Sequence, residues 1–142
     1  MAVKNFGAAF WLANASGTLT KIGSVTSVKA PSLTRGTIDT TDHDTPDGVM
    51  TFIGEGVADP GDGSVTINWV PGSAGDTLVL EALASGGNRD FKIVANGAAG
   101  KYELAGECIV TGYEPDDQPV TGKQTATISF KASGALAWDE AA

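Results

Sequence analysis

The sequence predicts a mostly β protein, a β-sandwich or barrel of about seven strands with one flanking α-helix. Of its 142 residues, 19 are glycine, about twice the usual share, and Thr, Val and Ala are abundant while aromatic residues are few, as in short strands joined by tight turns. Three segments also alternate apolar and polar residues, as half-buried strands do: 65–69, 102–110 and 125–130. The length fits a single domain over residues 1–142.

Two strands are predicted near the N-terminus. Residues Ala8–Leu12 form the first, which ends at the turn 14–17. Residues Leu19–Lys29 have apolar positions three apart, a spacing that also suits a short helix, but their Thr and Val content favours a strand. We expect that strand to contain a bulge near Gly23.

Residues Pro31–Gly63 show no periodicity and are rich in Gly, Pro, Thr and Asp. Segments of this length without regular structure are uncommon inside compact domains, and they usually serve a function or are disordered. No lysine or arginine lies between Arg35 and Arg89, whereas nine Asp and Glu residues do, so one region of the protein is strongly electronegative. We therefore predict that Pro31–Gly63 is an assembly arm or a lid.

The second half of the chain follows a clearer pattern. After the strand at 65–69, Ser73 and Asp76 match a capping box, which predicts a helix that ends at Gly86–Gly87. Strands over 91–93, 102–110 and 125–130 follow, and the order is β-β-loop-β-α-β-β-β. The end of the chain, Gly134–Ala142, is predicted to be a short tail with Trp138 as its possible anchor.

The composition excludes several classes of protein. A net charge of −8 argues against a nucleic-acid binder, which needs clustered basic residues to displace counterions from phosphate. The lone Cys108 excludes an internal disulfide framework and a cysteine-based zinc site, and it favours a reducing compartment. No signal peptide or membrane span is recognised, so we expect a soluble, unprocessed chain.

No catalytic or cofactor site is recognised. The only histidine, His43, lies in the aperiodic segment, and Cys108 has no basic neighbour in sequence to activate it. The acidic run Asp39–Gly48 suggests a calcium site as an alternative, although its spacing matches no EF-hand. The tryptophans offer a sugar-stacking platform as another alternative, but core packing explains two of them more simply. The three are Trp11, Trp69 and Trp138.

Several segments, in this order, resemble the tail tube proteins of lambda-type phages with long, non-contractile tails. They are Gly7–Leu12, the Asp-rich loop at 42–47, Trp69–Gly72, Arg89–Ile93, Asn96–Gly97 and Thr127–Gly134. The resemblance spans nearly the whole chain. It implies a β-sandwich that forms hexameric rings, with the inner sheets of neighbouring subunits paired edge to edge. The rings would stack into a hollow tail through which the genome passes from capsid to host.

This resemblance also implies how the long segment works. It would reach the next ring and become ordered only on assembly. We expect the apolar half, 49–57, to dock on that ring, with 49–53 able to form a strand there, while the acidic half, 39–47, stays solvated. The candidate assembly residues are Asp39, Asp42, Asp44, Asp47, Val49, Met50, Phe52, Ile53 and Val57.

The partners implied are other copies of the chain and the tail initiator, terminator and tape-measure proteins, with no membrane contact. DNA would pass through the lumen without specific binding, because an acidic wall does not hold phosphate. The protein would belong to the virion after assembly in the host cytoplasm. The alternatives are a secretion-system tube of the same fold, or a carbohydrate-binding or adhesin module; an enzyme is not expected.

Overall fold

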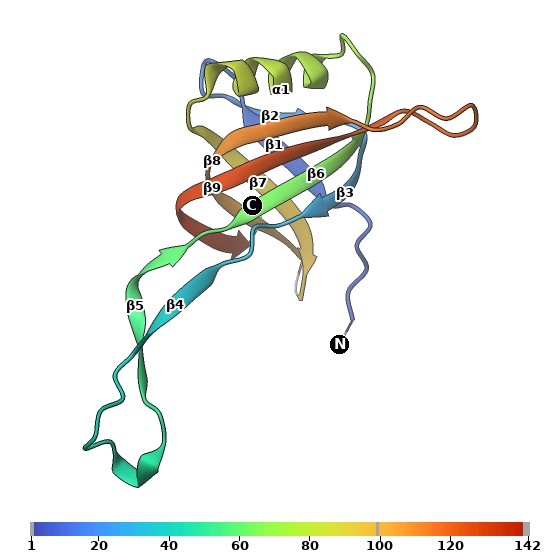
Figure 1. Ribbon diagram of the computed structural model, residues 1–142. Coiled ribbons are helices and arrows are strands. Elements are labelled where there is room, and N and C mark those ends of the chain that lie inside the picture. Colours follow the sequence, from blue (N-terminus) through green and yellow to red (C-terminus); the bar gives the residue numbers. More distant parts are fainter. Residues whose placement is uncertain (1, 99, 141–142) are drawn as a thin grey trace.

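The computed structural model describes residues 2–98 and 100–140, and within them the chain forms nine strands, one α-helix and one 3-10 turn (Figure 1). The elements are β1 (Ala9–Ala13), β2 (Leu19–Ile22), β3 (Val25–Lys29), β4 (Thr34–Asp39), η1 (Pro46–Gly48), β5 (Phe52–Asp59), β6 (Asp62–Asn68), α1 (Ala74–Ser85), β7 (Arg89–Gly97), β8 (Gly100–Pro115) and β9 (Thr125–Glu140). Seven strands form one sheet, so the predicted class is confirmed: mostly β with one helix.

The seven-stranded sheet is curled. Its strand order is β2-β1-β7-β8-β9-β6-β3, so β2 and β3 lie at opposite edges. Only Gly23 and Ser24 separate these two strands in the sequence, and neighbouring strands lie roughly 4.8 Å apart. Two residues cannot cross a flat sheet of seven strands, so the sheet bends until its edges approach each other. The prediction of one bulged strand over Leu19–Lys29 is therefore wrong, because the chain turns at Ser24, where φ is 59°, and changes edges.

The core lies inside this curl. Three phenylalanines from β1, β7 and β9 meet there: the ring centroids of Phe10 and Phe130 are 5.4 Å apart, and those of Phe91 and Phe130 are 5.2 Å apart. The buried residues of β6 and β9 alternate with polar ones that face outward. This alternation is the period of two on which the predicted strands depended.

The helix α1 closes one end of the curled sheet (Figure 1). The Ser73 hydroxyl accepts a hydrogen bond from the Asp76 backbone N–H at 3.3 Å, and Gly86, with φ of 69°, ends the helix. The predicted cap and end are therefore confirmed. Val79 and Ala82 carry its buried face. In the described part of the chain no helix is long and apolar enough to span a membrane.

Two long strands, β8 and β9, run through the sheet. The segment predicted to be a C-terminal tail belongs to β9 as far as Glu140, where Trp138 lies opposite Leu104 of β8. The remaining residues, 141–142, lie outside the described chain. The expected tail was wrong over 134–140 because its Ala and Gly residues carry little strand propensity, whereas a long partner strand supplies the hydrogen bonds.

Candidate assembly surfaces

The segment Pro31–Gly63 contains a two-stranded antiparallel ribbon, made of β4 and β5, that projects from the sheet as an arm (Figure 1). The expectation of a segment without regular structure is wrong over 34–39 and 52–59. Every residue of both strands is exposed, so neither face of the ribbon is buried and the sequence carries no alternation. An isolated ribbon is marginally stable in water, so the arm depends on a partner for rigidity.

The acidic half of the arm forms its tip. The Asp39 carboxylate accepts the Thr41 N–H at 2.8 Å, and the Asp42 carboxylate accepts the Asp44 N–H at 2.9 Å. Hydrogen bonds from the side chain and the backbone N–H of Thr41 lower the pKa of Asp39. The carboxylates therefore stabilise turns of their own backbone. Asp47 adopts a φ of 61° within η1.

The same tip gives no support to the calcium alternative. Among residues 2–98 and 100–140, no three acidic, histidine or cysteine side chains come together in a way that would hold a metal ion. His43 sits in the exposed tip, whereas Cys108 is fully buried in β8. Burial and the nearby charge of Asp90 raise the pKa of Cys108 to about 12, so its thiol is not activated.

The apolar half of the arm is exposed. Its large apolar side chains are more than half exposed in this chain: Val49, Met50, Phe52, Ile53 and Val57. Ile38 of β4 lies directly opposite Ile53 of β5 and adds to the same surface. Leu33 at the base of the arm is exposed as well. So many exposed apolar side chains on one projection mark a surface for another protein.

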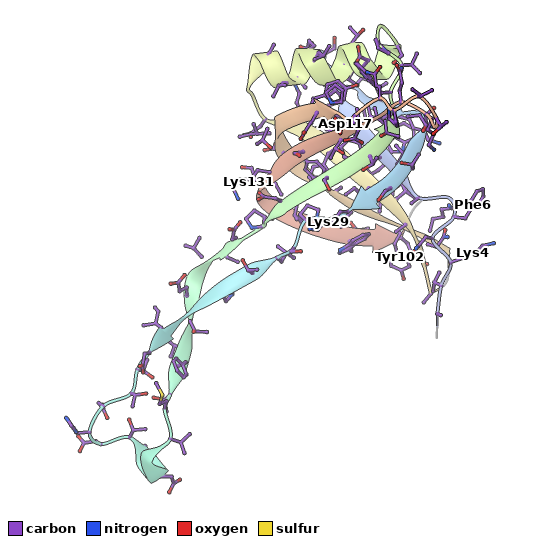
Figure 2. All side chains as sticks on the ribbon, turned by 45° about the vertical axis from the view of Figure 1, so that its right-hand side comes forward. Lys4, Phe6, Lys29, Tyr102, Asp117 and Lys131 are labelled. Atoms are coloured by element: carbon purple, nitrogen blue, oxygen red, sulfur yellow. The ribbon has the colours of Figure 1, made fainter. Side chains whose placement is uncertain are left out.

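At its base the arm is tied to the sheet. The Lys131 ammonium of β9 lies 3.4 Å from a carboxylate oxygen of Asp59 and 3.4 Å from one of Asp62, on either side of the turn between β5 and β6. At Gly61 in that turn, φ is 86° and an added Cβ would lie 2.1 Å from the Ser32 carbonyl oxygen, so only glycine fits. Figure 2 shows Lys131 and Lys29 where the arm leaves the sheet. This junction could not be predicted from the sequence, because Ser32, Gly61 and Lys131 lie far apart in the chain.

Among the described residues, the seven-stranded sheet has an unpaired edge at each end of its strand order. The strand β3 pairs with β6 on one side only, and β2 pairs with β1 on one side only. Residues 109–115 of β8 pair with β9 alone, but α1 packs against this part of β8 through the Tyr113–Asp76 hydrogen bond. Open edges offer unpaired backbone N–H and C=O groups to a strand of another chain.

The three tryptophans do not form one platform. Trp11 lies on the outward face of β1, with the Lys92 ammonium 4.5 Å from its ring centroid. Trp138 is 49% exposed and shares its register row with buried Leu104 and Ile93, which face the core. It lines a hollow that also contains Val3 and Ile93. The carbohydrate-binding alternative therefore has no support in the arrangement of these rings.

The third tryptophan, Trp69, takes part in a buried polar cluster that the sequence did not reveal. The Asp76 carboxylate, only 7% exposed, accepts hydrogen bonds from Trp69 Nε1 at 3.2 Å, from the Tyr113 hydroxyl at 2.7 Å and from the Gly72 N–H at 3.1 Å. Burial raises the pKa of Asp76, but the three bonds together outweigh it and lower the pKa. The cluster holds the start of α1 against β8.

A β protein with open strand edges and an exposed apolar arm belongs to the class of self-assembling structural subunits. The family model described as lambda phage tail tube protein matches residues 5–139. The chain belongs to this family, and its members are structural proteins of tail tubes. Among curated proteins none matches the sequence.

Solved structures share the fold at low sequence identity. The tail of an empty gene transfer agent particle aligns with a TM-score of 0.77 and 15% identity, covering 97% of this chain and 99% of that one. The SPP1 tail tube aligns at 0.66 and 19%, covering 94% and 77%. The Hcp1 protein of E. coli aligns at 0.54 and 10%, covering 94% and 97%. The chain is therefore similar in fold to the proteins of a gene transfer agent tail and of the SPP1 tail tube, and to Hcp1.

Proposed function

We propose that the protein is the subunit of a phage tail tube in which hexameric rings stack into a hollow conduit for DNA. The observation that carries the proposal is the projecting arm, whose apolar side chains have no cover within the chain and which leaves the sheet beside the open edge of β3. The arm of one ring docks on the next ring through Val49–Val57, while the acidic tip 39–47 stays in solvent.

Rings form through the open strand edges. An edge of one copy pairs with a different edge of the next copy, and such a head-to-tail contact closes into a ring when its rotation permits. The two edges of the sheet lie on different strands, β2 and β3, as this kind of contact requires. DNA passes through the tube without specific binding, and the tail initiator, terminator and tape-measure proteins are the further partners. Assembly takes place in the host cytoplasm.

Electron microscopy of the purified protein tests the proposal. We expect rings or tubes, either at high concentration or after addition of tail-tip components. A chain that stays monomeric under all these conditions would contradict it. A secretion-system tube of the same fold is the second candidate, since the fold similarity extends to the sheath-tube complex of an extracellular contractile injection system. The neighbouring genes separate the two, because only a tail that delivers a genome needs capsid genes.

A further inference from the structure

The described residues before β1, the N-terminal segment, form no strand. Two side chains of the β7–β8 hairpin hold the segment instead. The Asn96 side-chain amide donates to the Lys4 carbonyl at 2.7 Å and to the Phe6 carbonyl at 2.9 Å. The Lys101 ammonium donates to the Gly7 carbonyl at 3.0 Å. Because these bonds come from two side chains and not from backbone pairing, a chemical change in one side chain can release the segment.

Asn96 is the only asparagine of the sequence that is followed by glycine. A glycine has no side chain to hinder its backbone nitrogen, so that nitrogen reaches the preceding asparagine side chain more easily than any other residue's would. Asn96 also lies at the tip of the hairpin, where Gly97 pairs with Gly100 and the backbone is least restricted. An added Cβ at Gly97 would collide with the Tyr102 ring, so the packing of the hairpin requires a glycine after Asn96.

We propose that Asn96 is a site of spontaneous deamidation and that this reaction releases the N-terminal segment. The backbone nitrogen of Gly97 attacks Cγ of Asn96 and forms a new C–N bond. The side-chain amide group leaves as ammonia, taking the proton of the attacking nitrogen, and a succinimide ring remains. Water then opens the ring, which leaves an aspartate or an isoaspartate at position 96. Water is the only other reactant, and the loss of ammonia makes the change one-way.

The product reverses the hydrogen-bonding character of this side chain. A carboxylate only accepts hydrogen bonds, so it cannot donate to the carbonyls of Lys4 and Phe6, and its charge repels them. Position 96 also lies directly opposite Lys101 in the register of β7 and β8. A carboxylate there attracts the Lys101 ammonium, and this ion pair competes with the bond from Lys101 to the Gly7 carbonyl. One reaction thus weakens both attachments of the segment.

Release of the segment uncovers an apolar part of the sheet. Val3 of the segment lines a hollow together with Val28 of β3, Ile93 of β7 and Trp138 of β9. When the segment leaves, this hollow loses one wall and the Trp138 ring meets more water. The release should therefore shift tryptophan fluorescence to longer wavelengths while the core of the sheet stays folded.

Trypsin gives a direct measure of release, because it cleaves after Lys4, whose carbonyl is bound by Asn96. The folded protein is incubated at mildly alkaline pH, and peptide mass spectrometry measures conversion at position 96. The deamidated protein should be cleaved after Lys4 about tenfold faster than the fresh protein, because proteolysis follows the population of the released segment. Cleavage after Lys123, in the exposed β8–β9 loop, is the internal reference and should not change.

Two variants separate release from the effect of added charge. Asn96→Asp should show the fast cleavage after Lys4 without any incubation. Asn88→Asp adds the same charge at an exposed position outside the hairpin and should be cleaved like the wild type. Equal cleavage of the two variants overturns the inference, as does an Asn96 that stays intact in the folded protein while a peptide of residues 92–101 deamidates. Because every measurement is made on the monomer, the outcome is independent of whether rings assemble.

Discussion

Ile38 and Ile53 face each other across the arm ribbon as directly paired residues, 46% and 54% exposed. Cross-strand apolar pairs of this kind stabilise a ribbon by only a fraction of a kcal/mol. Most of their apolar surface stays in water until a partner covers it. The pair therefore contributes more free energy to an interface with another chain than to the stability of the monomer.

We expect Ile53→Asp to prevent stacking of rings without unfolding the monomer. A charge at this position would be buried without a partner at the interface, which is strongly unfavourable. Sedimentation and electron microscopy would measure assembly, and circular dichroism would measure the unfolding midpoint. Thr121→Asp, at an exposed position outside the arm, is the matched control and should assemble. Normal tubes of Ile53→Asp would show that the arm docks elsewhere.

Deletion of residues 39–47 should leave a folded monomer that does not polymerise, because it removes the connection between β4 and β5 and so displaces the apolar half of the arm. The segment contributes nothing to the buried core, and its loss leaves the seven-stranded sheet complete. Circular dichroism would measure whether the monomer is folded, and light scattering would measure whether it polymerises. Global unfolding of the deletion variant would show that the tip supports the sheet in a way that its exposure does not indicate.

Hydrogen exchange of the arm amides should differ between the monomer and the assembled tube. In the monomer, amides of β4 and β5 should exchange much faster than those of β6 and β9, because an isolated ribbon opens readily. In tubes the arm amides should become slow as the partner ring covers them. Strong protection of the arm in the monomer would mean that it is rigid without a partner.

Burial determines how far the sequence predicts this fold. Strands with one buried face, such as β6 with Val65 and Ile67 at 0% and 4% exposed, imprint their period on the sequence and are found easily. The ribbon has no buried face and leaves no such period. The turn at Ser24 cannot be predicted from the sequence either, because the step from one sheet edge to the other depends on the curl of the whole sheet.

The candidate surfaces were predictable to different degrees. The division of the arm into an acidic tip and an apolar half is visible in the sequence, because it depends on composition alone. The open edges at β2 and β3 are not, since they depend on which strands lack neighbours after folding. Asp76 was visible only as a helix cap, whereas its bonds to Trp69 and Tyr113 join residues far apart in the chain.

Asp76→Ala should destabilise the monomer by about 2–4 kcal/mol, because it leaves the Trp69 and Tyr113 donors buried without an acceptor. The pKa of Asp76 is lowered in the folded state. Ionised Asp76 therefore stabilises the fold in full at pH values above its pKa in the unfolded chain. This stabilisation is lost as the pH falls through its lowered pKa in the folded chain. Urea unfolding at pH 7 and at about pH 3 would show a smaller acid-induced loss in Asp76→Asn than in the wild type. Asp117→Asn, an exposed acid, is the control, and an equal loss in both variants would contradict this role.

The single cysteine offers a direct report on the core. Cys108 is 0% exposed and its pKa is raised to about 12 by burial and by the charge of Asp90, so at neutral pH the folded protein holds almost no reactive thiolate. We expect thiol reagents to label it only when the sheet opens between β7 and β8, at a rate that urea increases. Phe130→Ala, which removes a core ring at a cost of about 3–5 kcal/mol, should accelerate labelling in water, whereas Ile53→Asp on the arm should not. Rapid labelling of the wild type would mean that the sheet opens locally between β7 and β8 without global unfolding.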